Sequence, residues 1–160
     1  MDRIEQESPH SCGIAAMQMV TLLPPKTIHS MLGYSPDDIN VKNNLPYGTS
    51  EIEVIAVLWG LGYSPSLLVT KEHLYNISVD DASRERINVS LCLPNIEFLY
   101  DILIGNIAIL CTKDHHMVVW DELHILDPDP AKPGHRDYFE YEISSAIIII
   151  PPHFQSAQTH

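Results

Sequence analysis

The sequence predicts an α+β fold in which helices dominate the first part of the chain and an antiparallel sheet follows. Two observations predict this order. Apolar residues recur at helical spacing up to about residue 63, and short β-rich segments succeed one another from residue 106. A third observation bears on domain number. No repeat, low-complexity tract or linker divides the 160 residues, so we expect one domain over residues 1–153 and a flexible tail over 154–160.

The first predicted helix carries a cysteine in its first turn. The segment CGIAAMQMVTLL, residues 12–23, combines good helix formers with apolar residues at helical spacing, and Pro24 and Pro25 follow it. Ser11 stands where an N-cap residue is expected. Cys12 would then lie at the positive end of the helix dipole.

Further helices are expected between residues 27 and 104. The segment TIHSMLGY (27–34) predicts a second helix. A third is predicted for GTSEIEVIAVLWGLGY (48–63), which Thr49 or Ser50 would cap and Gly60 or Gly62 would end. The segment NIEFLYDILI (95–104) fits either a short helix or an extended stretch that leads into a strand. Loops within 26–47 and 70–95 are expected to build the subsite pockets.

The sheet is predicted from four short segments: NIAILCT (106–112), HMVVW (116–120), LHILD (123–127) and AIIII (146–150). If the second and third form a hairpin that turns at Asp121 and Glu122, their register follows. The predicted pairs are Trp120 with Leu123, Val119 with His124, Val118 with Ile125, Met117 with Leu126 and His116 with Asp127. His116 and Asp127 would then share one face at the open end of the hairpin, with Cβ atoms about 5 Å apart.

Composition and charge exclude several classes of function. The chain is 45% hydrophobic with a mean hydropathy of −0.01, as in soluble globular proteins. Its net charge of −12 argues against binding to a nucleic-acid backbone. We expect no signal peptide, and the longest apolar run, AIIIIPP (146–152), is too short to span a bilayer.

The three cysteines favour a reducing compartment. Cys12, Cys92 and Cys111 fit neither a disulfide framework nor a CxxC zinc site. We therefore expect a cytoplasmic protein, in a bacterium or in a host cell, that needs no cofactor.

Cys12 has the surroundings that a nucleophile requires. The reactive form of a cysteine is the thiolate, and both a helix N-terminus and a neighbouring histidine lower the thiol pKa. The histidine needs an acceptor on its second ring nitrogen to fix its orientation. The predicted hairpin supplies such a pair in His116 and Asp127.

The order of these residues resembles the papain-like cysteine peptidases, and among them the double-glycine leader peptidase family that trims bacteriocin precursors. That family carries a glutamine six residues before a CG pair and an Ala- and Met-rich helix, matched here by Gln6 and CGIAAMQM. Its small-residue helix start before a leucine-rich helix resembles GTSEIEVIAVLWGLG. A histidine leading a VV strand and a later DP pair match His116 and Asp127. The family usually has a glycine before its histidine, where this chain has His115.

The resemblance implies a papain-like fold, peptidase activity and a role for each matched residue. Cys12 would be the nucleophile, His116 the general base and acid, and Asp127 the residue that orients the histidine. Gln6 would donate its side-chain amide to the oxyanion, beside the backbone N–H of Cys12. The expected partner is a protein or peptide substrate, without nucleic acid or membrane insertion.

Other assignments remain open at this point. Cys92 and Cys111 lie in apolar runs and are expected in the core. His115 could replace His116 as the base or contact substrate, and Trp120 is expected in the core or as a wall of the substrate cleft. A zinc shell of His115, His116, His124 and Asp127 is the less favoured alternative to catalysis. An acyltransferase, or an inactive papain-like binding module with an acidic surface, would also fit the same pattern.

Overall fold

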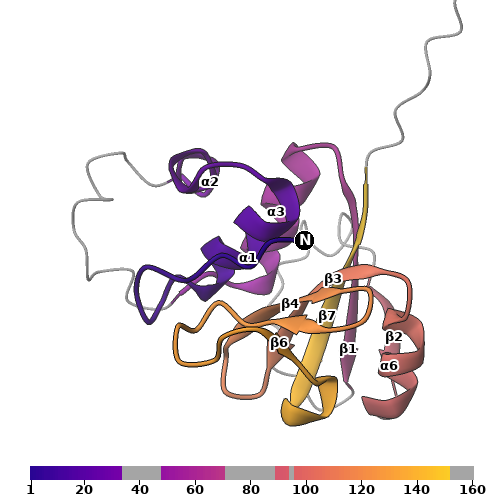
Figure 1. Cartoon of the computed structure of the whole chain (residues 1–160). Coiled ribbons are helices and arrows are strands. Elements are labelled where there is room, and N and C mark those ends of the chain that lie inside the picture. The colour runs from indigo at the N-terminus through magenta and orange to yellow at the C-terminus, as the bar shows by residue number, and fades with distance from the viewer. Residues whose placement is uncertain (34–47, 71–88, 94–95, 152–160) are drawn as a thin grey trace, which may run out of the picture.

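Figure 1 shows how the helices and strands are arranged. The helices form where the sequence has good helix formers between residues that end a helix. The computed structural model describes residues 1–33, 48–70, 89–93 and 96–151. Its helices are α1 (Cys12–Thr21), α2 (Pro25–Met31), α3 (Glu51–Gly60) and α6 (Ile96–Leu103), with a short 3₁₀ helix, η2 (Tyr138–Glu140). Ser50 and Glu53 form a capping box at the start of α3, which confirms one of the two caps predicted there. Of the two alternatives left open for 95–104, the structure shows a helix over Ile96–Leu103.

One sheet runs through the described residues. Its strands are β1 (Ser64–Thr70), β2 (Val89–Leu93), β3 (Ile107–Thr112), β4 (Met117–Asp121), β5 (Ile125–Leu126), β6 (His135–Arg136) and β7 (Ile143–Ile150). They follow the spatial order β2-β1-β7-β3-β4-β5-β6. The pair β1–β2 is parallel, and the other neighbouring pairs are antiparallel.

Both faces of this sheet are covered, and each has its own apolar core. Helices α1, α2 and α3 pack on one face, where Ile109, Val119 and Ile147 meet Cys12 and its neighbours. Helix α6 and η2 cover the other face. The strands therefore read as nearly continuous apolar runs rather than as alternating ones, since both of their faces are buried.

Two strands depart from the prediction that helices precede the sheet. Strand β1 follows α3 directly, and β2 lies inside the stretch 70–95 that was expected to be a loop. Strand β1 is difficult to predict from the sequence because it contains Pro65, and proline is rarely found inside a sheet. In the structure β2 pairs with β1 only from Leu67 onward, so Pro65 has a single neighbouring strand. In the other predicted pocket loop, 26–47, residues up to Met31 belong to helix α2. Residues 34–47, 71–88 and 94–95 of these loops, and the tail 154–160, lie outside the described residues.

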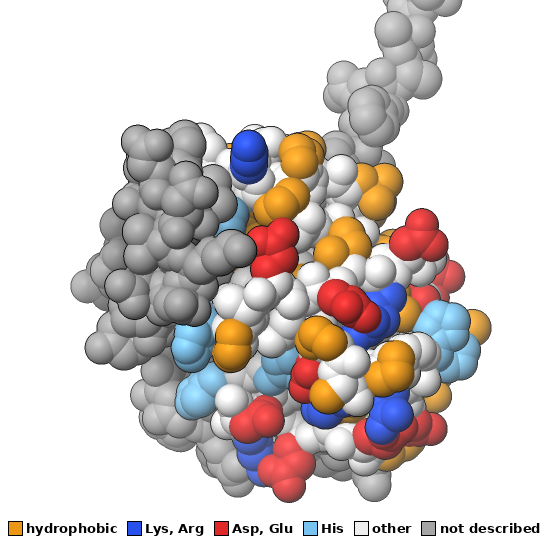
Figure 2. Space-filling view, turned by 60° about the vertical axis from the view of Figure 1, so that its left-hand side comes forward, with side chains coloured by type: hydrophobic (Ala, Val, Ile, Leu, Met, Phe, Trp, Pro, Cys, Tyr) orange, Lys and Arg blue, Asp and Glu red, His pale blue; other side chains and the backbone are white. Residues whose placement is uncertain are grey.

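The surface drawn in Figure 2 carries side chains of mixed character. On the face drawn in Figure 2, hydrophobic side chains are scattered among acidic and basic ones rather than gathered into a single patch. Within the described ranges, every helix is too short or too polar to cross a membrane.

Candidate active site

The N-terminus of α1 presents Cys12 as the first helical residue. Ser11 occupies the N-cap position, but its hydroxyl makes no capping bond to the helix. Instead it donates to the carbonyl oxygen of Ser8 at 3.0 Å and accepts from the Ser8 N–H at 2.9 Å. The prediction of Ser11 at the N-cap position is right, but a capping role for its hydroxyl is wrong. The Ser11 hydroxyl therefore satisfies none of the first N–H groups of α1. Cys12 lies at the end of the helix where these groups give the dipole its positive charge.

The Cys12 thiol lies in a nearly closed environment that favours its ionised form. The residue is 7% exposed. Burial raises the pKa of this thiol, but contacts with the His116 ring and with the backbone N–H of Met117 outweigh that effect and bring the pKa below its ordinary value. Cys111 has different surroundings, because its side-chain neighbours are Ser145 and Glu51 rather than a histidine. Burial holds the pKa of Cys111 well above its ordinary range.

His116 is held in place by the hairpin between β3 and β4. Its backbone carbonyl accepts from the Thr112 N–H at 2.9 Å, and its own N–H donates to Thr112 Oγ1 at 3.1 Å. Its Nε2 lies 2.7 Å from Asp127 Oδ1, which leaves Nδ1 as the ring nitrogen for the thiol. Burial lowers the pKa of His116, yet the contacts with Asp127 and Cys12 raise it to about 9. The histidine therefore holds its proton as an imidazolium at neutral pH.

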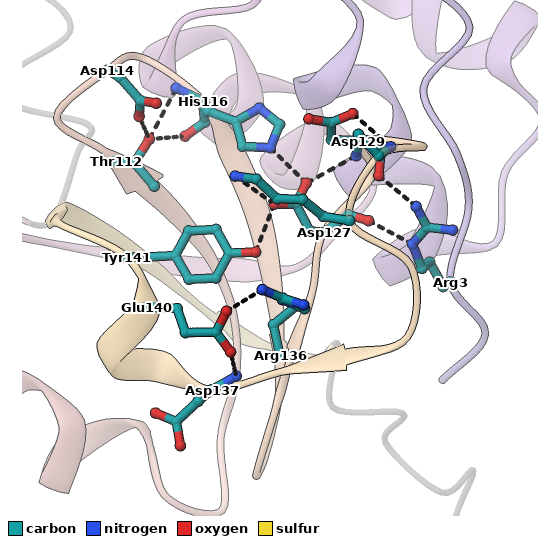
Figure 3. A network of polar contacts seen from close by, with 12 residues as sticks. Arg3, Thr112, Asp114, His116, Asp127, Asp129, Arg136, Asp137, Glu140 and Tyr141 are labelled. Carbon is teal, nitrogen blue, oxygen red and sulfur yellow. Dashed lines mark hydrogen bonds and ion pairs between the residues drawn. The ribbon is translucent and has the colours of Figure 1, made fainter.

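Asp127 is fully buried and all of its acceptor capacity is used (Figure 3). Oδ1 accepts from the Asp129 N–H at 2.8 Å as well as meeting His116. Oδ2 accepts from the Tyr141 hydroxyl at 2.6 Å, and Lys132 Nζ lies 3.4 Å away. Burial raises the pKa of Asp127, but these hydrogen bonds lower it to about 2. The carboxylate is therefore ionised and held in one orientation. A group that orients a catalytic histidine needs both properties.

Gln6 lies beside the loop that carries Asp127. Its backbone N–H donates to the carbonyl oxygen of Pro128 at 2.9 Å. Its side-chain Oε1 is buried and has no hydrogen-bond partner among the described residues. Buried amides in a core normally have all their polar atoms paired. The fold therefore leaves this amide oxygen of Gln6 unpaired within the described residues.

The predicted hairpin register is wrong by two residues. Val119 pairs with Leu126 and Trp120 with Ile125, because the turn lies at Glu122 and Leu123 rather than at Asp121 and Glu122. A shift of two residues keeps every side chain on its predicted face, whereas a shift of one would reverse them. For this reason His116 and Asp127 still meet, although they are no longer directly opposite each other.

Trp120 does not wall a cleft. Its side chain is 1% exposed, packs in the core on the α6 face and donates from Nε1 to the Leu103 carbonyl at 2.8 Å. The alternative prediction of a core tryptophan is the one that the structure bears out. Cys111 is likewise buried in the core, and the side chain of Cys92 lies outside the described residues.

The other histidines and carboxylates of this region point elsewhere. His115 is exposed in the turn before His116. The ring of His124 stacks on His135 with centroids 5.0 Å apart. Asp114 accepts from the Thr112 hydroxyl, and Asp121 accepts from the His124 N–H. Within the ranges that the structure describes, no group of three or more His, Cys, Asp or Glu side chains could hold a metal ion.

Three contacts of Asp127 escaped the sequence analysis. The bond from the Asp129 N–H is an Asx turn, which the sequence DPD could have suggested. Tyr141 and Lys132 carry no such signal, because Lys132 precedes β6, Tyr141 follows it, and only the fold brings both back to Asp127. Lys132 also lies over the Tyr141 ring, 5.0 Å from its centroid.

Comparisons with known proteins bear on the fold. No family model matches the chain, and no curated protein sequence matches it significantly. Among solved structures it is similar to the peptidase domain of Streptococcus ComA, a bi-functional ABC transporter involved in a quorum sensing pathway. The two share 13% identity with a TM-score of 0.53, over 93% of this chain and 97% of that domain. This likeness confirms the predicted α+β fold of papain-like type, with an N-terminal helix packed on the sheet.

Proposed function

We propose that this protein is a cysteine peptidase that hydrolyses a peptide or amide bond through an acyl-thioester on Cys12. One observation carries the proposal: the Cys12 thiol, the His116 ring and the Asp127 carboxylate form a continuous chain of contacts at the N-terminus of α1. The fold shared with a peptidase domain, and the resemblance to the bacteriocin-processing family, support a peptide as the substrate.

The chemistry follows from the charges in this chain of contacts. The Cys12 thiolate attacks the substrate carbonyl carbon, and the electron pair of the C=O bond moves to oxygen. Gln6 and the Cys12 backbone N–H would stabilise that oxyanion. When it collapses the C–N bond breaks, and the His116 proton passes to the leaving nitrogen. His116 then takes a proton from water, which attacks the thioester, and the thiolate leaves with the carboxylic acid product formed.

The first test is the alkylation rate of each cysteine against pH, with iodoacetamide and peptide mass spectrometry on the folded protein. We expect Cys12 to react well below the ordinary thiol pKa of about 8.5, and Cys111 to stay protected. His116→Ala should move the Cys12 profile to higher pH, because the effect of burial on the thiol pKa is then opposed only by the backbone contacts with Met117 and Gly13. His124→Ala is the matched control and should leave it unchanged, since His124 stacks on His135 instead. A Cys12 that titrates like an ordinary thiol in the wild type would rule the proposal out.

The second test concerns the acyl-enzyme itself. With p-nitrophenyl acetate, we expect acetyl transfer to Cys12, visible as added mass on its peptide, followed by hydrolysis. Removal of the His116 ring should slow acylation by about a hundredfold. Cleavage of a pool of synthetic peptides, with Cys12→Ala as the blank, then identifies the bond. Acylation without any turnover to free acid would point to an acceptor other than water, as in an acyltransferase.

A further inference from the structure

Three successive carbonyl groups of the Asp127 loop are bound by one N-terminal segment. Arg3 Nε donates to the Asp127 carbonyl at 2.6 Å, and Arg3 Nη2 donates to the Asp129 carbonyl at 2.7 Å (Figure 3). Between them, the Gln6 N–H donates to the Pro128 carbonyl at 2.9 Å. Residues more than 120 positions apart in the chain are thus joined at three adjacent points.

The guanidinium of Arg3 is committed to this contact. Its side chain is only 15% exposed, although a cation is normally left in water unless it is paired. The remaining nitrogen, Nη1, pairs with Glu5, whose side chain is 58% exposed. A planar guanidinium can reach both outer carbonyls at fixed geometry, which the single ammonium of a lysine cannot.

We propose that Arg3 is a positioning residue for acyl transfer, which fixes Gln6 against the loop of Asp127. The inference rests on the proposed function. Arg3 lies three residues before Gln6 and fastens to the carbonyls on either side of the one that Gln6 binds. The carboxylate contacts of Asp127 with Tyr141 and Asp129 do not involve Arg3, so we expect them to persist in a variant that lacks it. The loss of Arg3 therefore acts mainly on Gln6.

Two reagents separate these roles. Alkylation of Cys12 by iodoacetamide is a displacement that forms no oxyanion, so it reports only the thiolate and His116. Acylation by p-nitrophenyl acetate passes through a tetrahedral oxyanion and also depends on the Gln6 amide. A residue that acts through Gln6 changes the second rate and not the first. A residue needed for the fold in general changes both.

The experiment compares Arg3→Gln, Gln6→Ala and their double variant with the wild type. We expect Arg3→Gln to lower the acylation rate by about tenfold, and Gln6→Ala by about a hundredfold. Neither should change the alkylation rate. The double variant should be no slower than Gln6→Ala, because Arg3 then has nothing left to position. Arg3→Lys should fall between Arg3→Gln and the wild type.

Glu5→Gln is the matched control. It removes the exposed ion pair with Arg3 but leaves both carbonyl contacts, so acylation should stay at the wild-type rate. Three outcomes would overturn this inference without affecting the proposed function. The double variant could lose acylation rate by the product of the two single losses, Arg3→Gln could slow alkylation as much as acylation, or Arg3→Gln could acylate at the wild-type rate. A wild-type protein that is not acylated at Cys12 would overturn the proposed function as well.

Discussion

His115 adopts a backbone conformation that glycine usually occupies. It is the third residue of the loop between Thr112 and His116, with a φ of 63°, and its N–H donates to the Thr112 carbonyl at 3.1 Å. In three-residue hairpin loops this position is left-handed and favours glycine. The peptidase family that the sequence resembles usually has a glycine at this position. The requirement is therefore a matter of backbone geometry, and the histidine meets it at a cost.

We expect His115→Gly to stabilise the protein by about 0.5–1 kcal/mol. The left-handed conformation costs an ordinary residue about 1–2 kcal/mol, and the greater freedom of unfolded glycine cancels part of the gain. Urea unfolding of the variant beside His115→Ala, which keeps the strain but loses the ring, measures the effect. A glycine variant less stable than the alanine variant would contradict it. Equal loss of peptidase activity in both variants would instead indicate that the ring contacts substrate.

The His116–Asp127 pair should make stability depend on pH from both sides. The pKa of Asp127 falls from 3.8 to about 2 in the fold, so its contribution is present above 3.8 and lost as pH falls through about 2. The pKa of His116 rises from 6.5 to about 9, so its contribution is complete below 6.5 and lost as pH rises through about 9. The His116–Asp127 contact contributes to both shifts, beside the contacts of Asp127 with Tyr141 and Asp129 and of His116 with Cys12. We expect this one contact to be worth about 2 kcal/mol.

The test is urea unfolding of the wild type and His116→Gln from about pH 2 to pH 10. The difference in unfolding free energy should be largest between 3.8 and 6.5 and should shrink at both ends. A constant difference over the whole range would show that the pair is not an ion pair.

At the scale of elements, Gly13 lets α1 approach its neighbours closely. A Cβ at this residue would lie 2.8 Å from Thr49 Cβ and 3.0 Å from Met117 Sδ. Thr49 precedes α3 and Met117 begins β4, so the start of α1 is packed between two other elements. The glycine after Cys12 is therefore a packing requirement of the candidate site.

Gly13→Ala should cost about 1–2 kcal/mol. Overpacking costs about 1–3 kcal/mol, and we expect the upper part of that range because Thr49 Cβ, at 2.8 Å, is fixed to the backbone; the better helix propensity of alanine returns about 1 kcal/mol. The matched control is Gly60→Ala in α3, where the new Cβ would meet only the flexible end of Met31 at 3.2 Å. That variant should be as stable as the wild type or more so. Urea unfolding measures both, and equal stability of Gly13→Ala and wild type would refute the packing explanation.

How much could be predicted from the sequence differs between elements for physical reasons. The helices and most of the strands have local periodicity or capping signals, and the His116–Asp127 contact follows from strand alternation even in a shifted register. The bond from Tyr141 to Asp127 and the Arg3 contacts arise from distant segments that only the fold brings together. Strand β1 was missed because its proline contradicts the usual pattern of strands.

At the scale of the whole molecule, one sheet separates two cores that share their strands. On β3, Ile109 points to the helices α1–α3, whereas Ala108 and Leu110 point to α6; β4 and β7 alternate in the same way. Neither core can lose these strands without disrupting the other. The candidate site, which joins α1 to β4 and to the loop after β5, should therefore unfold together with both cores.

Two probes on opposite faces test this cooperativity. Trp120, 1% exposed, reports the core beneath α6, and Cys111, 5% exposed, reports the core beneath the other helices. The chain has two tryptophans, and Trp59 is 42% exposed. The variant Trp59→Phe therefore leaves Trp120 as the only tryptophan whose fluorescence is followed. In a urea titration, Trp120 fluorescence and the alkylation of Cys111 should then give the same midpoint, because the alternating strands couple the two faces. If Cys111 became reactive at a lower urea concentration than the fluorescence change, the helical layer that carries Cys12 would unfold separately from the sheet.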